Sequence, residues 1–144
     1  MDFSEPSYEG LNAANELSEH FSAELILVHF VSPMPNIAGT RAPTGFHVPT
    51  VLKEMEAQAN NRIADDDAHR ISKKVKSRTF VGIGKPADKI VQIAEDEAAN
   101  LIVMATHGQS GWQRFVSGSV TESMVRMATC PVFVVPAPDD QQRD

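Results

Sequence analysis

Short apolar runs alternate with amphipathic segments along most of the chain, and this alternation limits the possible folds more than any other feature. The runs at 25–31, 75–81, 101–105 and 131–135 are predicted to be strands. The segments 4–21 and 51–71, and those beginning near Pro86 and Ser119, repeat apolar side chains every three or four residues, as helices do. Strands separated by helices imply parallel pairing through right-handed crossovers. The sequence therefore predicts a three-layer, doubly wound α/β fold with a mostly parallel sheet.

The pattern also predicts which side chains face inward. In the first helix Ser4 is a candidate N-cap and Pro6 lies in the first turn. The expected inward positions of the helices are Leu11, Ala14, Leu17, Phe21, Met55, Ala59, Ile63, Ile90, Ile93, Ala94, Val120, Met124 and Met127. The acidic cluster 65–67 is expected on a solvated face, and residues 32–49 are expected to form a long surface loop.

Length and charge restrict the classes of function. The 144 residues are enough for one domain, predicted at 1–136, followed by a polar tail at 137–144. With 19 acidic and 13 basic side chains the net charge is -6, which disfavours nucleic acid as a partner. Cys130 is the only cysteine, and no apolar run approaches the about 18 residues that span a bilayer. We expect a cytoplasmic protein without a membrane segment or disulfide.

The segment 106–121 carries the features that phosphate binding needs. Glycines follow the predicted strand 101–105 and stand again at the start of the last helix. Glycine lets the backbone approach an anion closely, and the free N–H groups of a helix start supply donors at the positive end of the helix dipole. Gly118, Ser119, Val120 and Thr121 are the candidate donors.

A family resemblance follows from these residues. Gly108, nine intervening residues and Gly118-Ser119 resemble the G-x2-G-x9-G-[ST] loop of ATP-binding members of the universal stress protein A family, with Ala105 at the first glycine position. Asp2, the pair His29-Phe30 and the run Cys130-Pro131-Val132 resemble further positions of that family.

The resemblance implies a Rossmann-like fold of the HUP type, similar to the adenine nucleotide alpha hydrolases, with a five-stranded sheet. Family members have a first, central strand directly before the aspartate, and the chain has no residues for it ahead of Asp2. The resemblance also implies a homodimer that forms through the edge of the last strand.

The same resemblance implies a binding site for ATP, ADP or AMP, with Mg or Mn as a possible bridging ion. Asp2 would meet the ribose or the adenine, and Phe30 would border the adenine. Ala105, Thr106, His107 and Gly108 would lie along the ribose and phosphates, and Gly118, Ser119, Val120 and Thr121 would hold the phosphates. No metal ligand can be named.

Simpler roles remain open for several of these residues. Ser119 and Glu122 form the S-x-x-E pattern of a helix capping box, and His107 is as well explained as a backbone-bonding turn residue. Trp112 and Phe115 could cover a ligand or anchor a helical turn.

No catalytic residue can be assigned from spacing, so binding without fast turnover is favoured. The first hypothesis is a nucleotide-binding regulator of a stress response. The second is an interaction module of the same fold that binds no nucleotide. The third is a slow ATPase or autophosphorylating protein with Ser119 or Thr121 as the acceptor.

Overall fold

The computed structural model describes residues 1–32, 48–106 and 119–136. Helices and strands alternate through these residues, as the sequence predicts. Their order is α1 (Glu5–Phe21), β1 (Leu25–Val31), α2 (Val48–Arg70), β2 (Ser77–Ile83), α3 (Pro86–Asp96), β3 (Ile102–Ala105), α4 (Ser119–Met127) and β4 (Val132–Val135). The predicted tail at 137–144 lies outside the described residues.

The start of α1 is the one that the sequence predicts. Ser4 is the N-cap, and its side chain accepts a hydrogen bond from the Ser7 amide at 3.3 Å. The helix ends before Ser22, whose φ of 53° places it in the left-handed conformation. The inward prediction is confirmed for Leu11 and Ala14, which are buried. It is wrong for Phe21, which is 71% exposed because the last turn extends past the core.

The strands form two parallel pairs. β1 and β2 pair along their whole length, from Leu25 with Ser77 to Val31 with Ile83. β3 and β4 pair from Ile102 with Val132 to Ala105 with Val135. Within the described ranges β1 and β3 are not paired with each other, and each has one unpaired edge. In the described residues the structure therefore has two two-stranded parallel sheets where the resemblance predicts one sheet of five strands.

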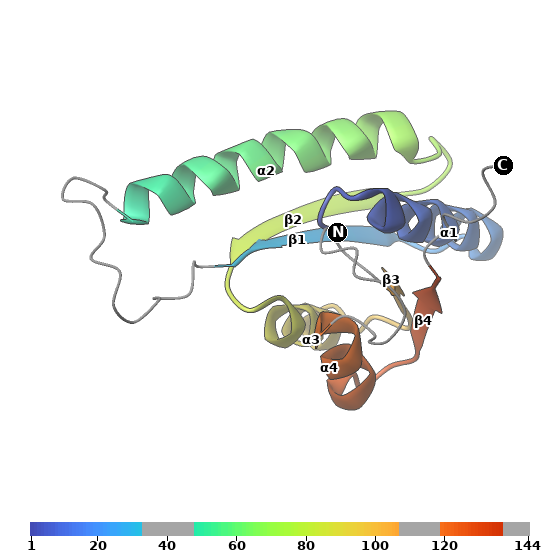
Figure 1. Cartoon of the computed structure of the whole chain (residues 1–144). Helices are drawn as coiled ribbons and strands as arrows, with labels where there is room; N and C mark the ends of the chain where they lie inside the picture. The colour runs from blue at the N-terminus through green and yellow to red at the C-terminus, as the bar shows by residue number, and fades with distance from the viewer. Residues whose placement is uncertain (33–47, 107–118, 137–144) are drawn as a thin grey trace, which may run out of the picture.

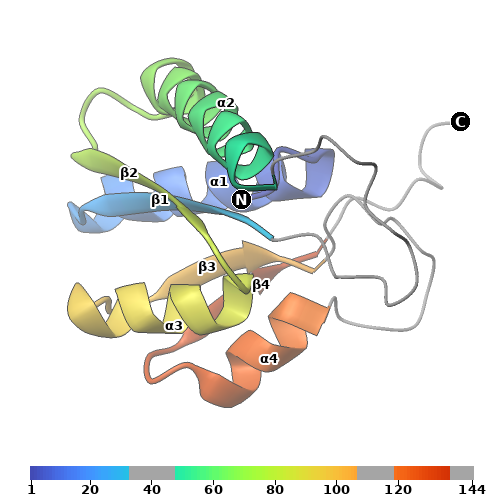
Figure 2. The ribbon, with the colours of Figure 1, turned by 90° about the vertical axis from the view of Figure 1, so that its left-hand side faces the viewer.

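The helices cover both faces of these sheets (Figures 1 and 2). On one side α2 packs on β1 and β2, while α1 packs mainly on β3 and also contacts β1 and β4. On the other side α3 contacts β1, and α4 contacts both α3 and β4. This is the predicted three-layer arrangement, with each helix layer spanning both sheets.

The main core lies under α1 and α2. Leu11, Leu27, Ile63, Ile71 and Val75 form one buried cluster, in which Ile63 is fully buried. Met124 of α4 is fully buried on the opposite side of the sheets. The inward predictions for Ala59, Ile63, Ala94 and Met124 are confirmed.

Four other burial predictions need correction. Asp66 belongs to the cluster expected to be solvated, but it is buried because it pairs with Arg70 and Tyr8. Met55 and Met127 are 43% and 40% exposed, since each lies at the margin of its helix's packed face. β3 is half-buried rather than buried.

No helix within the described ranges is long and apolar enough to cross a bilayer.

Candidate functional site

Ligands of doubly wound folds bind at the carboxyl ends of the parallel strands. In this chain that edge includes Ser32 after β1, Gly84 after β2, and Thr106 after β3. The Gly84 amide donates to the Val31 carbonyl at 3.0 Å, and the Thr106 amide donates to the Val135 carbonyl at 2.9 Å. These bonds extend both ladders to the edge where the site is expected.

A hollow of about 350 Å³ opens between the end of β1 and the helix α2, and we call it the β1 pocket. It is bounded by the N-terminal segment, by the last residues of β1 and by one face of α2. Its lining residues are Asp2, Phe3, His29, Phe30, Val31, Ser32, Met55, Gln58, Ala59 and Arg62. Asp2 and Phe30, the two residues predicted to meet the nucleoside, therefore line the same pocket.

Asp2 is held by the cap of α1. Its Oδ1 accepts hydrogen bonds from the Ser4 amide at 3.1 Å and from the Ser4 hydroxyl at 2.6 Å. The Asp2 amide in turn donates to Ser7 Oγ at 3.2 Å. The carboxylate thus has a fixed position at the rim of the pocket before any ligand arrives.

The Phe30 ring occupies a position that depends on Gly82 of β2. A Cβ added at Gly82 would lie 3.0 Å from Phe30 Cε1 and 3.2 Å from Phe80 Cε1. These distances are too short for ordinary van der Waals contact, so any larger residue at 82 would force both rings to move. The glycine lets the buried Phe30 ring lie directly against the neighbouring strand.

His29 links the N-terminal segment to β1. Its Nδ1 lies 2.7 Å from the Met1 carbonyl oxygen, and the Met1 amino group donates to the Val28 carbonyl. Partial burial lowers the pKa of His29, which favours the neutral ring with Nδ1–H as the donor to Met1. The centroid of the Phe3 ring is 4.7 Å from that of His29, so the imidazole also supports the pocket wall.

The start of α4 is joined to the end of β3. Thr121 is buried, and its hydroxyl donates to the Ala105 carbonyl at 3.2 Å. This bond places the first turn of α4 beside the residue that stands at the first glycine position of the family loop. It also gives the Thr121 hydroxyl a partner in the protein, which disfavours Thr121 as a phosphoryl acceptor.

The helix α1 connects the β1 pocket, which contains Asp2, with the end of β3, where Ala105 lies. A Cβ at Gly10 would lie 3.4 Å from the Ala105 nitrogen, so α1 packs closely on the end of β3. One turn earlier, Ser7 holds Asp2. The first two turns of α1 therefore place the β1 pocket and the end of β3 on the same side of the fold.

Several predicted residues cannot be placed. His107, Gly108, Gly118, Trp112 and Phe115 lie outside the described residues. Ser119 is the first residue of α4, and its side chain is not described. Val120 follows in the first turn and is half-buried.

Sequence reasoning did not select Phe3, Gln58 or Arg62 as pocket residues. A signal for the α2 residues does exist: Met55, Ala59 and Arg62 are spaced by four and three, so they lie along one side of the helix, at the margin of its packed face. The sequence pattern showed this side of the helix but not that it borders a hollow.

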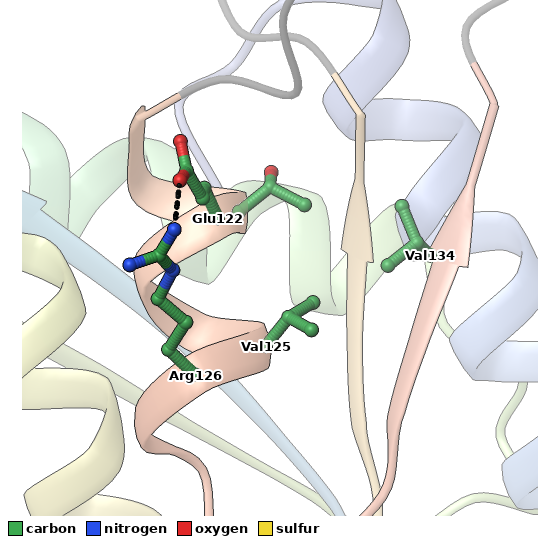
Figure 3. Close-up of a pocket in the computed structure, with 5 residues that line it drawn as sticks. Glu122, Val125, Arg126 and Val134 are labelled. Atoms are coloured by element: carbon green, nitrogen blue, oxygen red, sulfur yellow. Dashed lines mark hydrogen bonds and ion pairs between the residues drawn. The ribbon is translucent and has the colours of Figure 1, made fainter.

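A second hollow of about 360 Å³ lies between α4 and β4 (Figure 3). Its lining residues are Thr121, Glu122, Val125, Arg126 and Val134, and Arg126 donates to Glu122 at 2.8 Å. Val125 is 61% exposed, and the nearby strand residue Phe133 is 47% exposed. The hollow thus combines two valines with three polar side chains, and Thr121 of the predicted phosphate end is one of them.

Among the described residues no three His, Cys, Asp or Glu side chains are grouped so that they could hold a metal ion.

Comparison with known proteins gives the family. The family model described as the Universal stress protein family matches residues 1–136. The chain belongs to the universal stress protein family. This universal stress protein is 32% identical over 137 residues to Universal stress protein MJ0531 of Methanocaldococcus jannaschii, covering 95% of the chain and 79% of that relative. It is 26% identical over 139 residues to YxiE of Bacillus subtilis, covering 94% of each.

Solved structures show the same fold for this universal stress protein. UspA from Lactobacillus plantarum superposes with a TM-score of 0.76 at 21% identity, over 94% of the chain and 92% of that protein. A universal stress protein crystallised in complex with cAMP superposes with a TM-score of 0.60 at 20% identity, over 96% and 93%. These superpositions show that the chain shares the fold of both proteins.

Proposed function

We propose that this universal stress protein binds ATP or a related adenine nucleotide and acts as a regulator in a stress response. The observation that carries the proposal is that Asp2 and Phe30, chosen from the sequence for the nucleoside, line one pocket at the carboxyl end of β1. The cAMP complex of another family member supports a nucleotide as the ligand class.

The chemistry of the β1 pocket suits a nucleoside. Phe30, Val31 and Ala59 supply apolar surface for a flat heterocycle, and Asp2 and Gln58 supply polar atoms at its margin. The Asp2 carboxylate can accept hydrogen bonds from ribose hydroxyls, and its position is set by Ser4. Apolar walls with a few fixed polar groups are typical of small-molecule sites.

The first turn of α4 is the proposed phosphate end. The backbone N–H groups of residues 119–121, which belong to the first helical turn, would donate to phosphate oxygens, and the helix dipole would favour the anion. The hydrogen bond from Thr121 to Ala105 fixes this turn at the end of β3. Mg or Mn would bridge phosphate oxygens.

A homodimer through the outer edge of β4 and a cytoplasmic location are part of the same proposal. β4 is paired on one side only in the described residues, and Phe133 and Val125 expose apolar surface next to it. A second copy added along this edge would continue the sheet and cover these side chains.

Calorimetric titration of ATP, ADP and AMP, with and without Mg, tests the proposal. We expect binding by the unmodified chain and its loss in Gly118→Val, because a side chain there would obstruct the approach of phosphate to the helix start. Unchanged binding by Gly118→Val would refute the phosphate end. No heat with any nucleotide would favour the interaction module, and phosphate release that disappears in Ser119→Ala would favour the slow enzyme.

A further inference from the structure

We propose that Arg62 of α2 is a positioning residue, which fixes the wall of the β1 pocket formed by residues 2–4 and thereby sets the affinity for the nucleoside half of the ligand. This inference rests on the nucleotide site proposed above. It concerns a residue outside the glycine loop, on a helix to which the sequence assigned only a packing role.

The first observation is the backbone of Phe3. Its φ of 64° lies in the left-handed region, which residues with a bulky side chain rarely adopt. Such conformations persist where the surrounding structure holds them, and they occur often in binding sites. On one side the segment is held by the Asp2 carboxylate, which accepts from the Ser4 amide and hydroxyl.

Arg62 holds the same segment from the other side. Its Nη2 donates to the Phe3 carbonyl oxygen at 3.4 Å, and its Cζ lies 4.5 Å from the centre of the Phe3 ring. One planar guanidinium therefore contacts both the carbonyl and the ring of Phe3. The Phe3 ring also contacts His29 on β1, so Arg62 presses the segment toward the strand.

Arg62 is itself held in place. Its Nη2 also donates to the Tyr8 hydroxyl at 3.4 Å, and that hydroxyl donates to Asp66 Oδ2 at 3.3 Å. Asp66 is buried, and its Oδ1 accepts from Arg70 Nε at 3.0 Å. Arg70 lies over the Tyr8 ring at 4.0 Å. This chain from α1 to α2 restricts where the Arg62 head can lie.

The location of Arg62 points to the nucleoside rather than the phosphates. Arg62 lines the β1 pocket together with Asp2 and Phe3. The proposed phosphate end belongs to α4, and Figure 2 shows α2 and α4 on opposite sides of the strands. Loss of Arg62 should therefore weaken adenosine, AMP and ATP by the same factor.

The experiment compares Arg62→Ala, Arg62→Lys and the control His69→Ala by calorimetry with adenosine, AMP and ATP. His69 is on the same helix, its side chain is 73% exposed and pairs with Asp65, and it does not line the pocket. We expect the Kd of Arg62→Ala to rise about tenfold for all three ligands. Arg62→Lys should lose most of the same affinity, because an ammonium cannot reach the carbonyl and cover the ring together. His69→Ala should change Kd by no more than about twofold.

A loss that grows with the number of phosphates, or full rescue by lysine, would overturn the proposal in favour of a direct charge contact. An unchanged Kd in Arg62→Ala would also overturn it.

A second readout needs no ligand. Hydrogen exchange at the Ser4 and Ser7 amides should accelerate in Arg62→Ala and not in His69→Ala, since Arg62 contacts Phe3 whereas His69 pairs with Asp65. Unchanged exchange would refute the positioning role. If the unmodified chain bound no nucleotide, the proposed function would fail, while this measurement would still decide whether Arg62 fixes the segment.

Discussion

The hydroxyl of Thr121 donates to the carbonyl of Ala105 at 3.2 Å, and this bond joins the first turn of α4 to the last residue of β3. Both residues belong to the segment that resembles a nucleotide loop. The bond spans 16 positions of the chain and crosses the whole loop. It therefore fixes the distance between the two ends of that loop.

Replacing Thr121 by valine keeps the shape of the side chain and removes this hydrogen bond. Because Thr121 is buried, we expect the free energy of unfolding to fall by about 1 to 3 kcal/mol. Denaturant titrations at an unchanged m-value would measure the loss. Thr121→Ser retains the hydroxyl and should recover most of the stability. Equal stability of the valine variant and the unmodified chain would show that the bond does not hold α4 in place.

A second prediction concerns the adjacent carboxylates Asp65 and Asp66. The Asp66 side chain is 8% exposed and pairs with Arg70, whereas the Asp65 side chain is 73% exposed and pairs with His69. Asp66→Ala leaves Tyr8 and Arg70 without their acceptor, so it should cost about 1 to 3 kcal/mol of unfolding free energy.

Asp65→Ala is the matched control. An exposed pair contributes less than about 1 kcal/mol, so this variant should remain close to the unmodified chain in thermal and denaturant unfolding. Similar losses in both variants would contradict the role of Asp66 in joining α1 to α2.

The third prediction is a pH dependence that comes from His29. Burial lowers its pKa in the folded chain below the ordinary value of 6.5, so the unfolded chain takes up the proton first as the solution is acidified. The contribution of His29 to stability is complete above pH 6.5 and is lost as the pH falls below that value.

Unfolding titrations between pH 8 and pH 5, made on the unmodified chain and on His29→Gln, would measure this contribution. Glutamine keeps a donor for the Met1 carbonyl and does not titrate, so the stability of this variant should fall less steeply on acidification. Identical slopes in the two proteins would contradict a lowered pKa at His29.

The sequence predicted the order of elements and most of their bounds, because the signals for them are local. The strand 25–31 and the cap at Ser4 came from an apolar run and a single hydroxyl, and both are present. The exposure of Phe21 and the burial of Asp66 could not be predicted in the same way. They depend on where α1 passes the edge of the core and on contacts with residues 58 positions away.

The residues of the candidate site also differ in whether a sequence pattern predicts them. Asp2 and Phe30 were selected from a family pattern, and the structure brings them into one pocket. Arg62 was not selected, because nothing local in α2 indicates that its head reaches Phe3, 59 positions earlier in the chain. The pairing of β1 and β3 on one side only is also a property of the assembled sheet, which no single run of residues encodes.

The central claim is that one nucleotide contacts both the β1 pocket and the start of α4. The most direct test is an NMR titration of the ¹⁵N-labelled chain with ATP and Mg. We predict that the amide signals of Asp2 and Phe30 and those of Val120 and Thr121 shift together and saturate with a single Kd. The absence of shifts at these four amides, or shifts confined to the surface around Val125 and Phe133, would contradict the account.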